Sequence, residues 1–225
     1  MNLKKILPLT LAACTLTPIF TNAYADGWPV YAPNGFYVVG EAGLGYVTNN
    51  KLKNLSSVSS DGVIYARPNQ KMSGVFTQHL AVGDYLINPD SITAVGFELG
   101  FTNFSKVKSS VATSLNGVNT TGTQETTAWS ATLESIASFN IIGNSVALFG
   151  KLGLGYANIK RSLALTDKTP ITADKQNNSS VGIAGGLGLR FALTQNIALR
   201  LETDGFTDGG HANYVAGLAG VEFDF

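Results

Sequence analysis

Hydrophobic and polar side chains alternate with a period of two along most of the chain beyond residue 35. Large apolar residues such as Phe97, Leu99 and Phe101 occupy one set of positions, and glycine, alanine, serine and single charged residues occupy the other. This alternation is typical of β-strands, because successive side chains point to opposite faces. It predicts eight strands, within residues 36–46, 73–87, 93–101, 129–141, 146–156, 181–193, 197–202 and 215–225.

The connections between these strands alternate in length. Short turns are expected at 87–91, 142–145 and 194–196, whereas long polar loops are expected near 48–72, 105–125 and 158–180, with a shorter one at 204–213. Short turns at one end and long loops at the other are the plan of an up-and-down barrel with both termini at the short-turn end. The strand within 73–87 fits either register equally well, so the sequence leaves its inward face open.

Composition decides which face points outward. Charged residues make up 13% of the chain, about half of the ~25% that is usual in soluble domains. The strands of a soluble, lipocalin-like barrel also alternate between apolar and polar residues, but a surface in contact with water usually carries more charged residues than this chain has. The bulky apolar face therefore suits lipid, and the face rich in small residues suits a narrow interior. We predict an all-β fold, an eight-stranded antiparallel up-and-down transmembrane barrel, and the net charge of +0 gives no reason to expect nucleic-acid binding.

The first residues have the features of an export signal. Lys4 and Lys5 precede an apolar stretch, and Ala23-Tyr24-Ala25 forms a small-residue cleavage site. We predict a signal peptide over residues 1–25, cleaved after Ala25, and a barrel domain over residues 26–225. Leu11-Ala12-Ala13-Cys14 also resembles a lipoprotein signal, so lipidation of Cys14 is the alternative to ordinary cleavage.

Short motifs in four parts of the chain carry a family resemblance. They are Gly35-Phe36-Tyr37-Val38 with Gly43-Leu44-Gly45-Tyr46, Val95-Gly96-Phe97-Glu98-Leu99-Gly100-Phe101, Lys151-Leu152-Gly153-Leu154-Gly155-Tyr156, and Val221-Glu222-Phe223-Asp224-Phe225. With these motifs the sequence resembles the OmpA-like family of small eight-stranded outer-membrane proteins, which have a porin-like barrel domain.

The resemblance implies a location and an assembly route. The location is the bacterial outer membrane, in contact with its lipid and lipopolysaccharide. The route is recognition of a carboxy-terminal aromatic signal by the barrel-insertion machinery, here matched by Gly220, Phe223 and Phe225. Leu218 departs from the signal, because a polar residue is usual at that position.

Charged residues recur on the inward face and predict a polar plug. Strands four apart face each other across an eight-stranded barrel, which predicts pairing of Glu41 with Lys151, Asp84 with Arg190, and Glu98 with Arg200. The Asp84 pair requires the register of its strand that turns this residue inward. Unpaired charges are costly in a narrow interior, so the pairs should be hydrogen-bonded and should block the bore. The complete predicted set is Glu41, Asp84, Glu98, Glu134, Lys151, Arg190, Arg200, Glu202 and Glu222, of which Glu134 and Glu222 face each other without a cation.

Catalytic and metal-binding signals are weak. His79 has no nearby serine in sequence, and we interpret it as a polar strand residue. His211 lies near Asp204 and Asp208 in a predicted loop, which fits either a loose cation site or an ordinary polar loop tip. We therefore expect no enzyme activity, no cofactor and no resident metal.

Basic residues are concentrated in the predicted long loops. They indicate either ordinary solvated charge or attraction to lipopolysaccharide phosphates and host or environmental polyanions. The sequence favours a monomeric barrel with a structural or surface-exposed role, in loop-mediated binding or adhesion. The alternatives are a small diffusion pore and a lipid-modifying enzyme. The basic loop residues are Lys51, Lys53, Arg67, Lys71, Lys160 and Arg161.

Overall fold

A computed structural model describes residues 35–49, 55–59, 62–66, 71–86, 93–115, 118–142, 145–165, 175–209 and 212–225. Its strands are β1 (Gly35–Asn49), β2 (Leu55–Ser59), β3 (Gly62–Ala66), β4 (Lys71–Tyr85), β5 (Thr93–Leu115), β6 (Val118–Ile142), β7 (Val146–Leu165), β8 (Lys175–Ala192), β9 (Ile197–Thr207) and β10 (Ala212–Asp224). The predicted signal peptide and the lipidation alternative at Cys14 lie outside the described residues. Among the described residues, no helix is long and apolar enough to cross a membrane.

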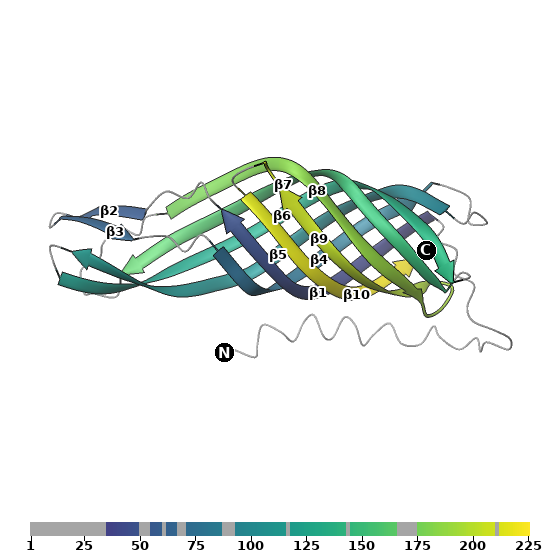
Figure 1. The fold of residues 1–225 in the computed structure, drawn as a ribbon, viewed down its shortest axis with the longest axis horizontal. Coiled ribbons are helices and arrows are strands. Elements are labelled where there is room, and N and C mark those ends of the chain that lie inside the picture. The colour runs from purple at the N-terminus through teal and green to yellow at the C-terminus, as the bar shows by residue number, and fades with distance from the viewer. Residues whose placement is uncertain are drawn as a thin grey trace.

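Eight of these strands close into an antiparallel barrel in the order β1-β10-β9-β8-β7-β6-β5-β4. Pairing of β1 with both β10 and β4 closes the ring, with Glu41 opposite Gly220 on one side and opposite His79 on the other. Figure 1 shows the strands inclined to the long axis of the barrel. The predicted fold class is therefore confirmed.

The alternating sequence sorts side chains between the outside and the inside of the barrel. Leu44, Leu80, Leu152 and Leu187 each leave more than 60% of their surface exposed, although all four are strongly apolar. An exposed apolar band of this kind on a β-barrel is typical of contact with lipid. Phe101, Trp129 and Tyr156 form an aromatic cluster on the outer face, with ring centroids 5.9 Å and 5.5 Å apart, and such residues mark the edge of the lipid band.

The stretches predicted to be long loops are largely β-structure. β5 and β6 have 23 and 25 residues and remain paired out to Leu115 and Val118, and β2 pairs with β3 in a separate two-stranded sheet. Figure 1 shows these hairpins extending beyond one end of the barrel, opposite the end at which the chain terminates. The loop prediction was wrong over 105–125 because Ser, Thr and Val in polar segments still favour a strand when a partner strand continues beside them.

The structure also decides the register of β4. His79, Ala81, Gly83 and Tyr85 point inward, while Phe76, Leu80 and Val82 point outward. Because β4 pairs with β1 on one side and with β5 on the other, its side chains can alternate between the two faces of the barrel in one way only. A shift of one residue would bury the apolar set and expose the polar one, which is why neighbouring strands determine the register.

Candidate functional site

The centre of the barrel interior holds a connected set of buried ion pairs, here called the charge network. Lys151 Nζ donates hydrogen bonds to Glu98 Oε1 at 2.9 Å and to Glu202 Oε1 at 3.0 Å. Arg200 donates to the second oxygens of the same carboxylates, at 2.8 Å to Glu98 and 2.7 Å to Glu202. Glu134 Oε2 lies 3.8 Å from Lys151 Nζ. Two cations thus share two carboxylates, and the pairing offsets the cost of burying all four charges.

The charge network continues toward the short-turn end of the barrel. Arg190 donates to Glu222 Oε2 at 2.8 Å and to the Tyr85 hydroxyl, and Arg200 donates to Glu222 Oε2 at 3.3 Å. Arg190 also lies over the Tyr85 ring at 4.9 Å, and Arg200 lies over the Phe149 ring at 4.3 Å. Aromatic faces attract cations in a desolvated site. Aromatic rings therefore pack directly against the arginines across the bore.

Tyr37 joins the charge network to this aromatic layer. Its hydroxyl donates to Glu98 Oε2 at 2.9 Å, and its ring stacks on Tyr85 with centroids 4.9 Å apart. Gly83 makes room for the ring, since a Cβ at this position would come within 2.2 Å of Tyr37. The bore at this level is filled by side chains.

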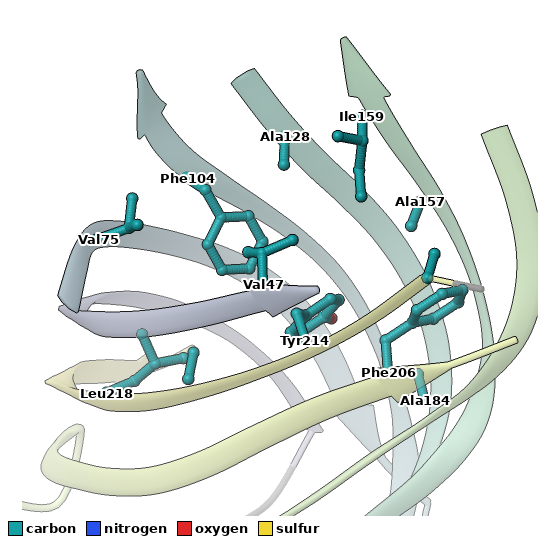
Figure 2. Close-up of a cluster of buried hydrophobic side chains, with 12 residues drawn as sticks. Val47, Val75, Phe104, Ala128, Ala157, Ile159, Ala184, Phe206, Tyr214 and Leu218 are labelled. Carbon is teal, nitrogen blue, oxygen red and sulfur yellow. The ribbon is translucent and has the colours of Figure 1, made fainter. Parts of the chain in front are cut away.

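A buried apolar cluster covers the charge network on the side of the long hairpins. Figure 2 shows Phe104, Phe206 and Tyr214 among small side chains from several strands. Tyr214 stacks on Phe206 at 5.7 Å, and its hydroxyl donates to Asp204 Oδ2 at 3.3 Å and accepts from Ser130 at 3.1 Å. The interior is thus layered, with charges between two aromatic layers.

The predicted facing pairs are realised in part. Every residue of the predicted interior set except Asp84 is buried. Asp84 lies on the outer face of β4, so it cannot reach Arg190, and Glu222 takes that place. Glu41 lies 3.7 Å from Arg200 Nε, with no ion pair to Lys151 among the described residues. The stagger of the tilted strands displaces facing partners along the barrel axis, and a simple count of strands does not include this displacement.

Several interior residues were not identified from the sequence. His79 and Tyr37 are completely buried. The sequence did not place His79 in the interior, because it left the register of β4 open. Asp204, which we assigned to a loop, lies inside β9 and is also completely buried. It therefore does not share a loop with Asp208, as the interpretation of a loose cation site required. Asp208 Oδ1 accepts a hydrogen bond from the backbone N–H of Ala212 at 2.9 Å. His211 lies outside the described residues.

The basic residues assigned to the loops divide between the surface and the interior. Lys160 is exposed, but Arg161 is buried because strand alternation continues into this segment of β7 and turns it inward. That assignment of Arg161 to an exposed loop was therefore wrong. Lys71 lies in β4. The others, Lys51, Lys53 and Arg67, lie outside the described residues.

A surface ion-pair cluster lies on the extension of the β5–β6 hairpin. Glu125 forms ion pairs with Lys106 and, at 3.2 Å, with Lys108. The hydrogen bond from Lys106, together with the one from Lys108, holds the pKa of the Glu125 carboxyl below its ordinary value of 4.5. Both lysines are thus partly neutralised and offer less charge to an external anion.

The chain end closes the barrel seam. The backbone N–H of Phe225 donates to Phe36 O at 3.0 Å, and the two rings lie 5.9 Å apart. Gly220 lies against β1, where a Cβ would come within 2.1 Å of Gly40 O. Phe223 lies at a position of β10 whose side chain points out of the barrel. Recognition of these residues by the insertion machinery stays a prediction.

Comparison with known proteins identifies relatives in fold. A family model described as an outer membrane protein β-barrel domain matches residues 11–224. No curated relative matches the sequence. The crystal structure of Ail, the attachment invasion locus protein of Yersinia pestis, has a TM-score of 0.50 at 12% identity and covers 85% of this chain and 99% of that chain. The outer membrane protease OmpT of Escherichia coli has a TM-score of 0.50 at 9% sequence identity, and the match covers 90% of this chain and 100% of that chain. The outer membrane protein OprG of Pseudomonas aeruginosa has a TM-score of 0.47 at 14% sequence identity, and the match covers 88% of this chain and 99% of that chain.

Proposed function

The chain belongs to the outer-membrane protein β-barrel domain family of the bacterial outer membrane, and from this we propose that it is a non-catalytic, monomeric barrel that presents its long hairpins at the cell surface. The buried charge network is the observation that carries the proposal. The charge network spans it with ion pairs of 2.7–3.3 Å whose side chains are fully buried. A barrel of eight strands has an interior that side chains can fill.

Electrical recording separates this role from that of a diffusion pore. Purified protein in planar bilayers should give no steady conductance. A variant with both Arg190 and Tyr85 replaced by alanine serves as the positive control, because it removes two large side chains that fill the bore. It should show currents and so demonstrate that insertion is detectable. Steady conductance of the unmodified protein would contradict the proposal.

Burial also argues against a lipid-modifying enzyme. OmpT is a protease with this general fold, so the fold alone decides nothing about catalysis. In this chain His79 is completely buried, and Glu98 and Glu202 are held by Lys151 and Arg200. A general base must reach the substrate proton, and these groups do not reach the surface. Lipid A from cells with and without the protein should give the same mass spectrum; a new lipid A species would refute the non-catalytic role.

The long hairpins would bind polyanions weakly through their basic residues. Exposed Lys160 supports this, together with Lys51 and Lys53 in the sequence. Replacing these three lysines by glutamine should lower retention on heparin or lipopolysaccharide. The retention should also fall with salt, since the Debye length is ~8 Å at physiological ionic strength. Replacing Lys106 and Lys108 is the matched control, because Glu125 already pairs with both. Equal retention of both variants would refute this binding mode.

A further inference from the structure

We propose that the barrel interior binds one divalent transition-metal cation between Glu41, His79 and Glu202. One ligand atom from each residue lies within 4.8 Å of the others, and all three residues are buried. The residues come from β1, β4 and β9, which are far apart in sequence. An imidazole nitrogen with carboxylate oxygens is a ligand set that suits Zn²⁺ and similar ions.

Buried polar atoms without a partner favour a bound cation at this position. Among the residues that the structure describes, His79 Nε2 and both carboxylate oxygens of Glu41 find no hydrogen-bond partner, although all three atoms are inaccessible to solvent. Polar atoms buried in this way are costly, and most find a partner. The nearest cation to Glu41 is Arg200, whose Nε lies 3.7 Å from Oε1, too far for a hydrogen bond. A bound cation would satisfy these atoms together.

The arrangement around the histidine is that of a metal ligand. His79 Nδ1 lies 2.9 Å from Thr102 Oγ1, and in the tautomer in which Nδ1 donates its proton to this hydroxyl, Nε2 keeps a lone pair for a metal. Metal-binding histidines usually donate their other ring N–H in this way. Gly100 provides the space for the ring, since a Cβ there would lie 2.8 Å from His79 Cε1.

Glu202 already forms ion pairs with Lys151 and Arg200, but its carboxylate can still bind a metal. Its Oε1 accepts one hydrogen bond, from Lys151, and a carboxylate oxygen has two lone pairs. Ligand atoms at ~2.0 Å from a tetrahedral Zn²⁺ are roughly 3.3 Å apart, so small side-chain rotations would complete the site. Lys151 and Arg200 would then act as outer partners that orient Glu202.

The charge balance of the charge network favours a cation. Within the described part of the chain, the ion pairs of the charge network connect five glutamates, Glu41, Glu98, Glu134, Glu202 and Glu222, with three basic residues, Lys151, Arg190 and Arg200. With every group ionised, the network has two more negative than positive charges (5 − 3 = 2). Uncompensated charge is costly away from water. One divalent ion would supply the missing two positive charges.

Zn²⁺ content tests the proposal directly. The barrel is folded with Zn²⁺ present, freed of loosely bound metal and analysed by elemental mass spectrometry. We expect about one Zn²⁺ per protein, and loss of it in His79→Gln and in Glu41→Gln. The other histidine provides a matched control, since His211→Gln should keep the metal. Folded wild-type protein without Zn²⁺, or loss of the metal in His211→Gln alone, would overturn the proposal.

A second measurement covers the case in which the variants do not fold. X-ray absorption of the Zn²⁺-loaded wild-type protein should show nitrogen and oxygen neighbours at ~2.0–2.1 Å together with the outer-shell scattering of one imidazole ring. A spectrum without imidazole scattering would refute the site, because it would indicate surface carboxylates or water. Neutralisation of the charge network by protons would appear as an absence of bound metal in both measurements, and this result would equally refute the proposal.

Discussion

Replacement of Lys151 by methionine tests whether the charge network holds the barrel together. Methionine keeps much of the length and volume of the lysine stem and removes only the charged end. In the native barrel this end lies 2.9 Å from Glu98, 3.0 Å from Glu202 and 3.8 Å from Glu134. All four side chains are inaccessible to solvent, so water cannot replace the lost partner.

The expected loss is large. Removing one member of a buried ion pair typically costs ~3–5 kcal/mol, because the remaining charge stays buried without compensation. Here Arg200 still contacts Glu98 and Glu202, while Glu134 loses the ion pair with Lys151 and keeps the hydrogen bond from Thr132 at 3.0 Å. We therefore expect a loss of about 3 kcal/mol, near the lower end of this range. For a chain of this size such a loss lowers the melting temperature by roughly 6–12 °C.

Urea unfolding in lipid vesicles would measure the change in free energy, and the heat-dependent shift of the folded band on a gel would give an independent ranking. Lys160→Met is the matched control, because Lys160 lies on the same strand and is exposed. Glu134→Gln in the Lys151→Met background should recover part of the loss. If Lys151→Met and Lys160→Met unfold alike, buried pairing does not stabilise this barrel and the reasoning is wrong.

Two further predictions concern packing and titration. Gly83→Ala should lower the free energy of unfolding by ~1–3 kcal/mol, because a Cβ there would overlap the Tyr37 ring at 2.2 Å. Gly217→Ala, which has open space around its Cβ position, should leave stability nearly unchanged, and equal effects would contradict the packing argument. NMR titration should place the pKa of Glu125 below 4.5, so its ion pairs contribute above that pH and are lost as the pH falls through the lowered pKa. Lys106→Gln should return the pKa toward 4.5, and no change would refute the assigned cause.

The sequence alone determined the class of fold and the two faces of the barrel. Side chains on a strand alternate with a period of two, so the positions of Leu99 and Glu98 on opposite faces follow from local geometry. The low fraction of charged residues then assigned the apolar face to the exterior. These inferences need no knowledge of which strands meet, and the exposed Leu152 beside buried Lys151 confirms them on β7.

Only the tertiary structure decided which interior groups meet. Closing a barrel tilts the strands and staggers them, so residues at equal positions in facing strands are displaced along the axis. For this reason Glu41 approaches Arg200, while Lys151 pairs with Glu98 and Glu202. The ambiguous β4 took its register from pairing with β1 and β5, which turned His79 inward and Asp84 outward. The convergence of Glu41, His79 and Glu202 depends on both effects, and neither is encoded in the spacing of residues along the chain.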